Sequence, residues 1–153
     1  MNVQIKVDDL GDPCIAAFLE DHIKDMRAVS PPESKHALDL DGLKKPEITF
    51  WSVWDDSTLV GCGAIKRLDA EHAELKSMRT SPLHRRKGLG ATILNFILQE
   101  ARHRGYRRIS LETGSMPFFI PARSLYAKHG FRYCSPFAEY KLDPNSVFMT
   151  RDL

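Results

Sequence analysis

Apolar and polar residues follow different periods along the chain, and these periods predict a series of strands and helices. Residues Val3 to Val7 alternate as in a strand with one buried face. After Gly11-Asp12-Pro13, apolar residues recur at helical spacing as far as about Arg27, which predicts an amphipathic helix. Ser30-Pro31-Pro32 ends that helix, and His36 to Leu43 predicts a short second one.

The middle of the chain predicts three antiparallel strands. Ile48 to Trp54 and Leu59 to Leu68 are joined through Asp55-Asp56-Ser57, as in a hairpin. Ala73 to Thr80 is the third strand, and Ser81-Pro82 ends it because proline cannot continue a ladder of hydrogen bonds. We expect the three strands to form a meander.

From Gly88 onward the pattern changes to a helical period, which continues until Gly105 ends the helix. The strand Arg108 to Glu112 follows this helix, so we expect it to lie parallel to Ala73 to Thr80 after a right-handed crossover. The apolar positions of the helix are Leu89, Ile93, Leu94, Ile97, Leu98 and Ala101.

The last part of the chain predicts one more helix and two closing strands. Ala122 to His129 is the helix, and Phe131 to Cys134 and Val147 to Thr150 are the strands. The whole series predicts a single α/β domain over residues 1–153, called α+β in some schemes. Its mixed central sheet should have about six or seven strands and about four flanking helices.

Composition narrows the class of protein. Hydrophobic residues make up 42% and charged residues 27%, which is close to average and favours neither disorder nor a fibrous fold. We expect a cytoplasmic protein without a membrane partner, because no apolar run is long enough for a membrane span or a signal peptide. The three cysteines lack a CxxC spacing and the six histidines lack an i, i+4 pair, so no metal site is predicted.

A basic, glycine-containing loop stands between the third strand and the long helix. It contains Arg85-Arg86-Lys87, followed by Gly88 and Gly90. Unpaired amides and the helix dipole attract anions at a helix N-terminus, and glycines let a pyrophosphate approach the backbone. The loop is not a Walker A motif, because Leu89 follows Gly88 where Lys-Ser/Thr is required, and a dinucleotide fingerprint would need glycine in place of Ile93.

The pattern Arg85-x-x-Gly88-x-Gly90 after a strand that ends in Ser-Pro resembles the acetyl-CoA loop of the GNAT family of N-acetyltransferases. Ala122-x-x-Leu125-Tyr126-x-x-x-Gly130-Phe131 resembles a later element of that family. The resemblance covers most of the chain and implies an acyl-CoA N-acyltransferase fold. It also implies transfer of acetyl from acetyl-CoA to a primary amine of a small molecule or peptide, by direct attack in a ternary complex.

The resemblance implies which residues hold acetyl-CoA. Backbone groups of Met78 and Thr80 would pair with the pantetheine arm in the manner of an added strand. The sheet should open in a V beyond Arg79, and an amide near Met78 would stabilise the oxyanion. The complete set of implied acetyl-CoA residues is Met78, Arg79, Thr80, Arg85, Arg86, Lys87, Gly88, Leu89, Gly90, Ala91 and Tyr126.

Three residues carry the implied chemistry. Tyr126 matches the family's tyrosine near the CoA sulfur and would protonate the leaving thiolate. Glu74 is the first candidate for the base that deprotonates the amine, and alternation puts it on the face of Lys76 and Met78. Glu112, at the end of the next strand, is the alternate base. A water relay with neither carboxylate stays open.

The acceptor amine is not identified by the sequence. Phe119 stands where many family members have asparagine, so Phe118-Phe119-Ile120-Pro121 would form an apolar wall. His36, Trp51 and Trp54 are candidates for the acceptor side, although core packing is favoured for both tryptophans. The alternative function is a non-catalytic CoA-sensing or partner-binding module on the same fold. The sequence leaves open whether the protein forms a homodimer. A net charge of +2 argues against a nucleic-acid partner.

Overall fold

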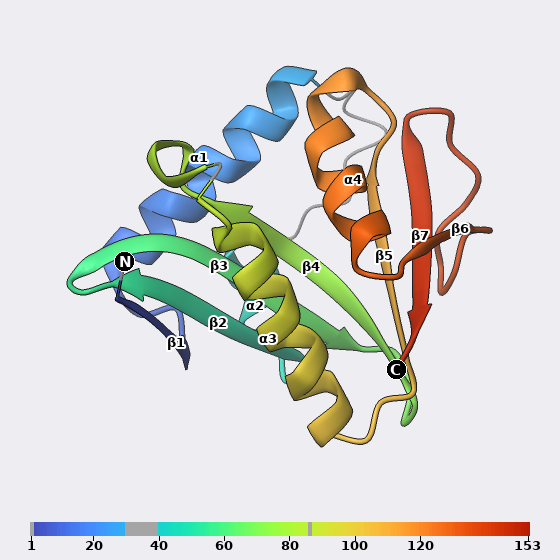
Figure 1. The fold of residues 1–153 in the computed structure, drawn as a ribbon, viewed down its shortest axis with the longest axis horizontal. Helices are drawn as coiled ribbons and strands as arrows, with labels where there is room; N and C mark the ends of the chain where they lie inside the picture. The colour runs from blue at the N-terminus through green and yellow to red at the C-terminus, as the bar shows by residue number, and fades with distance from the viewer. Residues whose placement is uncertain (1, 30–39, 86) are drawn as a thin grey trace.

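A computed structural model describes residues 2–29, 40–85 and 87–153. Its centre is a seven-stranded sheet in the order β1-β2-β3-β4-β5-β7-β6 (Figure 1). Neighbouring strands are antiparallel except β4 and β5, which are parallel. The mixed sheet and the parallel pair confirm the predictions. The strands are β1 Val3–Val7, β2 Ile48–Asp55, β3 Thr58–Arg67, β4 His72–Thr80, β5 Arg108–Gly114, β6 Arg132–Cys134 and β7 Ser146–Asp152.

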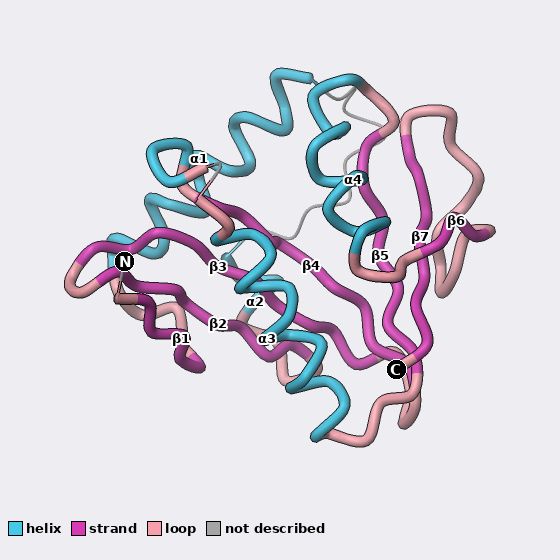
Figure 2. The backbone as a smooth tube through the Cα atoms, in the orientation of Figure 1, coloured by secondary structure: helices cyan, strands magenta, loops and turns pink. Residues whose placement is uncertain are grey.

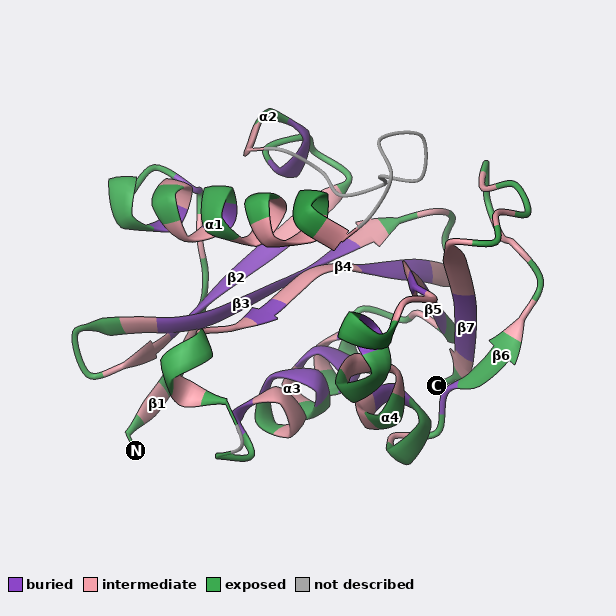
Figure 3. Cartoon of the chain, turned by 90° about the horizontal axis from the view of Figure 1, so that it is seen from above, coloured by how far each residue is buried: buried purple, intermediate pink, exposed green. Residues whose placement is uncertain are grey.

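Helices cover both faces of the sheet (Figure 3). On one face lie α1, Pro13–Val29, and α2, Leu40–Leu43. On the other lie α3, Leu89–His103, and α4, Ile120–Lys128. The described part of the predicted second helix is helical, while residues 36–39 lie outside the described residues. The four helices of the described chain agree with the prediction.

Glycines in β3 allow α3 to pack closely on the sheet. A Cβ atom at Gly61 would lie 2.7 Å from Cδ1 of Ile93, and one at Gly63 would lie 2.6 Å from Cδ1 of Ile97. These distances are shorter than real contacts, so a larger residue at either position would force the end of a buried isoleucine side chain to move. Ile93 and Ile97 are fully buried in the larger core cluster, which anchors α3 and its N-terminal loop to the sheet.

A β-bulge in β4 changes which side chains share a face. The register between β3 and β4 shifts between Cys62 and Ala64, and Ser77 has a positive φ of 52°. One extra residue in a strand reverses the alternation beyond it. Met78 therefore packs against the core on the α3 side, whereas Lys76 bonds to Glu74 on the other face. The prediction that Glu74 shares a face with Met78 was wrong for this reason.

Strands β4 and β5 separate soon after they begin to pair. Their pairing covers only His72 to Glu74, opposite Arg108 to Ser110. Beyond this point β5 follows β7, with which it pairs along its whole length, and the two ribbons diverge from β4 (Figure 2). The predicted V-shaped opening is present, but it begins at Glu74 and not beyond Arg79.

Candidate active site

A cavity of about 540 Å³ lies where β4 and β5 separate. Its wall includes residues of both strands, of α1, of the loop before α3 and of α4. This volume suits a small ligand or the reacting end of a longer one. The cavity brings together all three predicted catalytic residues, Glu74, Glu112 and Tyr126.

The glycine loop forms one end of the cavity. Gly88 is the N-cap of α3 and has a left-handed conformation with φ of 76°, and no side-chain hydrogen bond caps the helix in the described part of the chain. Arg85, Gly88, Leu89 and Gly90 line the cavity. Lys87 is exposed and does not line it, and the predicted Arg86 lies outside the described residues. The uncapped amides of α3 fit the predicted anion site.

Tyr126 projects from α4 into the same cavity. Its side chain is buried and packs on the ring of Phe131, with the ring centroids 5.7 Å apart. Burial raises the pKa of Tyr126 to about 12. The phenol therefore keeps its proton at neutral pH and can donate a hydrogen bond to an anion.

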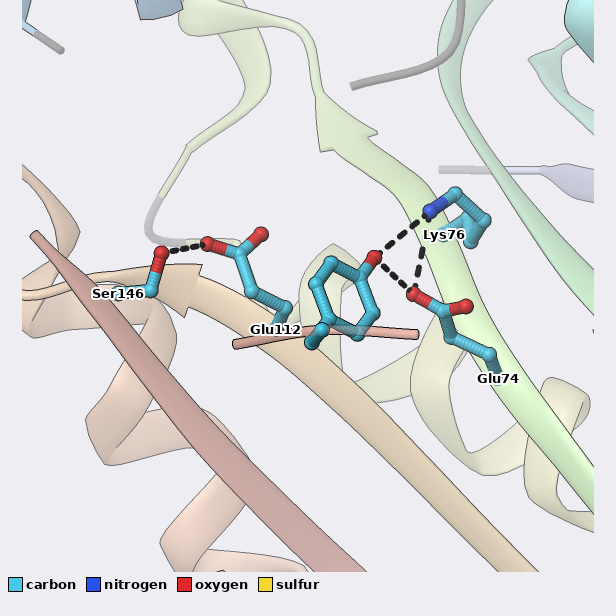
Figure 4. A network of polar contacts seen from close by, with 5 residues as sticks. Glu74, Lys76, Glu112 and Ser146 are labelled. Atoms are coloured by element: carbon cyan, nitrogen blue, oxygen red, sulfur yellow. Dashed lines mark hydrogen bonds and ion pairs between the residues drawn. The ribbon is translucent and has the colours of Figure 1, made fainter. Parts of the chain in front are cut away.

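Glu74 is held by two donors at the point where the strands separate. Its Oε2 atom accepts hydrogen bonds from the Tyr140 hydroxyl at 2.5 Å and from Nζ of Lys76 at 3.1 Å (Figure 4). Nζ of Lys76 also donates to the Tyr140 hydroxyl at 3.1 Å. Burial, followed by the charge of Glu74, raises the pKa of Tyr140 far above its usual value. Tyr140 is therefore a permanent donor that fixes the orientation of the Glu74 carboxylate.

Glu112 faces the opening from the other strand. Its Oε2 atom accepts a hydrogen bond from the Ser146 hydroxyl of β7 at 2.7 Å (Figure 4). Glu74 on β4 and Glu112 on β5 thus border the cavity from its two sides. The geometry leaves both carboxylates as candidates for a base.

Arg79 points away from the glycine loop. Its guanidinium lies 5.3 Å from the ring centre of Phe18 in α1, and its Nη1 atom donates to Asp25 at 3.0 Å. Nη1 also lies 3.5 Å from Nδ1 of His22. Burial and the charge of Arg79 lower the pKa of His22 to about 4, so this imidazole is neutral. The side chain predicted for acetyl-CoA binding therefore lies on the α1 side of the sheet.

The model of the acetyltransferase (GNAT) family matches residues 15–131. The chain belongs to this family. It is 55% identical to the uncharacterized N-acetyltransferase YsnE of Bacillus subtilis (strain 168), with 99% of this chain and 100% of that protein covered. It is 36% identical to the IAA acetyltransferase of Azospirillum brasilense, with 99% of each chain covered.

Solved structures show the same fold. A putative acyl-CoA N-acyltransferase from Klebsiella pneumoniae has a TM-score of 0.78 and 26% identity, with 99% of this chain and 97% of that chain covered. A GNAT acetyltransferase from Elizabethkingia anophelis, solved with acetyl-CoA bound, has a TM-score of 0.67 and 17% identity over 99% of each chain. This GNAT protein therefore has the acyl-CoA N-acyltransferase fold and is an acetyl-CoA-dependent acyltransferase.

Phe119, at the position that the resemblance assigns to an asparagine in many family members, is a buried residue at the end of the turn Pro117–Phe119 before α4. It packs so closely on the end of β5 that a Cβ atom at Gly114 would lie 2.2 Å from its ring. Three residues of the predicted apolar wall line the cavity, Phe118, Phe119 and Pro121, whereas Ile120 is exposed and does not. Trp51 and Trp54 pack in the core clusters and do not line it, and His36 lies outside the described residues.

Sequence reasoning missed the hydrogen-bond partners of both carboxylates. Tyr140 lies in the segment between β6 and β7, which carries turn residues and no periodic pattern. Ser146 begins β7, which pairs with β5 only in the folded sheet. Neither residue belongs to a local motif, so only the pairing of distant segments places them beside Glu74 and Glu112.

Proposed function

We propose that the protein transfers acetyl from acetyl-CoA to a primary amine of a small molecule or peptide within a ternary complex. The observation that carries this proposal is the cavity between β4 and β5, because it joins a glycine loop at a helix N-terminus to a buried tyrosine and two carboxylates. Residues 1–153 would act as one domain.

The GNAT family uses acetyl-CoA, and two features of this chain fit it. Beyond Glu74, β5 does not pair with β4, and backbone groups at Met78 and Thr80 would bind a pantetheine arm as an added strand. Amides from residues 86–91, with Arg85 beside them, would hold the pyrophosphate. Bound acetyl-CoA supplies the thioester that the acceptor attacks.

Glu74 and Tyr126 would act on the protons of the acceptor amine and of the leaving thiol. Glu74 takes a proton from the acceptor ammonium, directly or through water, so that the neutral amine can attack the thioester carbonyl carbon. The C–S bond breaks, and Tyr126 donates a hydrogen bond to the departing thiolate. With phenol and thiol pKa values of about 12 and about 8.5, complete transfer from Tyr126 alone would cost about 5 kcal/mol. The acceptor ammonium loses two protons as it becomes the amide: one finally resides on the CoA thiol, and the other passes through Glu74 to solvent.

The choice of base is tested with matched substitutions. We expect Glu74→Gln to lower kcat/KM for the amine by 10²-fold or more, the usual range for loss of a general base, and Glu112→Gln by less than about tenfold. The measurement is the initial rate of CoA release at saturating acetyl-CoA with the acceptor concentration varied, from pH 6 to 9. A larger loss in Glu112→Gln would transfer the role to Glu112, and small losses in both variants would contradict base catalysis by either carboxylate.

A further inference from the structure

The side chain of Arg79 is a buried cation with donors to spare. Only 8% of the residue is exposed, yet it borders the cavity. A guanidinium has five N–H donors, and the contacts of Arg79 in the described residues use only Nη1. Its Nε atom is buried and has no hydrogen-bond partner in the described part of the chain. Leaving such a donor unpaired costs stability, which a fitting ligand would recover.

The charge of Arg79 is also weakly compensated. Its carboxylate partner Asp25 has a side chain that is 45% exposed, so solvent screens this ion pair. His22 is neutral because its pKa is about 4, and it adds no negative charge. Glu74, the other acid on this face of β4, is already paired with Lys76. Within the described residues, the α1 side of the cavity therefore keeps a positive charge at Arg79 that is not fully balanced.

The position of Arg79 separates it from the acetyl-CoA loop. The glycine loop leads into α3, on the opposite face of the sheet from α1 (Figure 3). Because of the bulge at Ser77, Arg79 shares the α1 face with Glu74, the proposed base. A molecule that approaches Glu74 from this face also meets the guanidinium.

From these observations we infer that the acceptor is a primary amine that also carries a carboxylate, and that Arg79 binds this carboxylate. Guanidinium and carboxylate match in shape and charge, and pairs of this kind accept two parallel N–H···O bonds. The inference rests on the proposed function, because it names the class of acceptor that the same cavity takes. Arg79 acts in binding and specificity, and takes no part in proton transfer.

The test compares acids with their amides. Straight-chain amino acids from glycine to 6-aminohexanoate, together with the common L-amino acids, are each paired with the corresponding carboxamide in the CoA-release assay. We expect kcat/KM for the accepted acid to exceed that for its amide by about 10- to 100-fold, which corresponds to a hydrogen bond to a charged group. The chain length of the best acid then indicates the distance between the guanidinium of Arg79 and the carboxylate of Glu74. Equal turnover of acids and amides would overturn the inference and leave the proposed function standing.

Substitution of Arg79 tests whether this residue causes the preference for acids over amides. In Arg79→Gln the ratio of acid to amide should fall to about one, and Arg79→Lys should retain only part of it. The ratio is measured within one preparation, so partial misfolding of a variant cancels. Arg104→Gln is the matched control, because Arg104 stacks on Trp51 outside the cavity and its loss should leave the ratio unchanged. An unchanged ratio in Arg79→Gln would show that Arg79 is only structural.

A binding measurement separates this inference from the proposed function. The same acids and amides are titrated calorimetrically into the protein saturated with CoA. Heat from an acid, absent with its amide and lost in Arg79→Gln, supports a carboxylate site even if no amine is acetylated. Turnover of amines together with no preference for acids in either assay rejects the inference alone. Absence of both binding and turnover rejects both proposals.

Discussion

The Tyr140 hydroxyl orients the carboxylate of Glu74, the proposed base, although the two residues are far apart in the sequence. It lies 2.5 Å from Oε2 of Glu74, and Lys76 reaches the same two oxygens. Such a short hydrogen bond to a carboxylate is among the stronger kinds in proteins. The position of the Glu74 carboxylate therefore depends on a loop residue 66 positions away.

Removing that hydroxyl should impair turnover without removing the base. We expect Tyr140→Phe to lower kcat about tenfold, since the ring and its packing on Phe148 remain while Glu74 loses its orienting donor. The measurement is steady-state CoA release with acetyl-CoA and the acceptor both varied. Tyr133→Phe, at an exposed position in β6, is the control and should leave kcat unchanged. Equal rates for Tyr140→Phe and the unaltered protein would show that this hydrogen bond plays no part in turnover.

At the scale of elements, the periodicity predicts much of this fold because it is a local property. The six apolar positions named for the long helix are all buried in α3, and the hairpin of β2 and β3 forms where the sequence places it. The bulge at Ser77 and the early end of the β4–β5 pairing carry no such signal, because they depend on the register between strands. These two features decide which side chains enter the cavity, so the site could be predicted only in part.

Glycines with positive φ stand at both ends of α3. Gly88 and Gly105 have φ values of 76° and 87°, and a Cβ atom at either would meet nothing within 4 Å. Alanine at either position should therefore lower the free energy of unfolding by a similar amount, about 1 kcal/mol, through backbone strain alone. Urea denaturation measures this effect.

Acetyl-CoA binding should distinguish the two glycines. Gly88→Ala should weaken binding about tenfold, because strain at the N-cap moves the amides that we assign to the pyrophosphate, whereas Gly105→Ala, at the other end of α3, should bind normally. Isothermal titration with acetyl-CoA makes the comparison. Unaltered affinity in Gly88→Ala would argue against a pyrophosphate at this loop.

For the whole molecule, a neutral histidine links stability to pH. The pKa of His22 is about 4 in the fold, against an ordinary value of 6.5, because burial and Arg79 disfavour its charged form. Between these two values the unfolded chain binds the proton and the folded chain does not, so unfolding becomes more favourable as the pH falls. At about 1.4 kcal/mol per pH unit, the loss reaches up to about 3 kcal/mol at pH 4.

Replacing this histidine should flatten the pH dependence. We expect the free energy of unfolding of His22→Asn to fall less between pH 6.5 and pH 4 than that of the unaltered protein, as measured by urea denaturation at closely spaced pH values. His103→Asn is the control, because the His103 side chain is 80% exposed, and its curve should run parallel to that of the unaltered protein. Parallel curves for His22→Asn and the unaltered protein would contradict the burial of a neutral imidazole.

The reaction that we propose is acetyl transfer from acetyl-CoA to an amine in the cavity between β4 and β5. Its most direct test is CoA release, detected with a thiol reagent, from acetyl-CoA and a panel of amines, with mass spectrometry of the products. We expect amine-dependent release, an N-acetylated product, and a rate about a hundredfold lower in Tyr126→Phe with acetyl-CoA binding retained. Binding of acetyl-CoA without amine-dependent release, on a panel that includes amines with carboxylates, would contradict it.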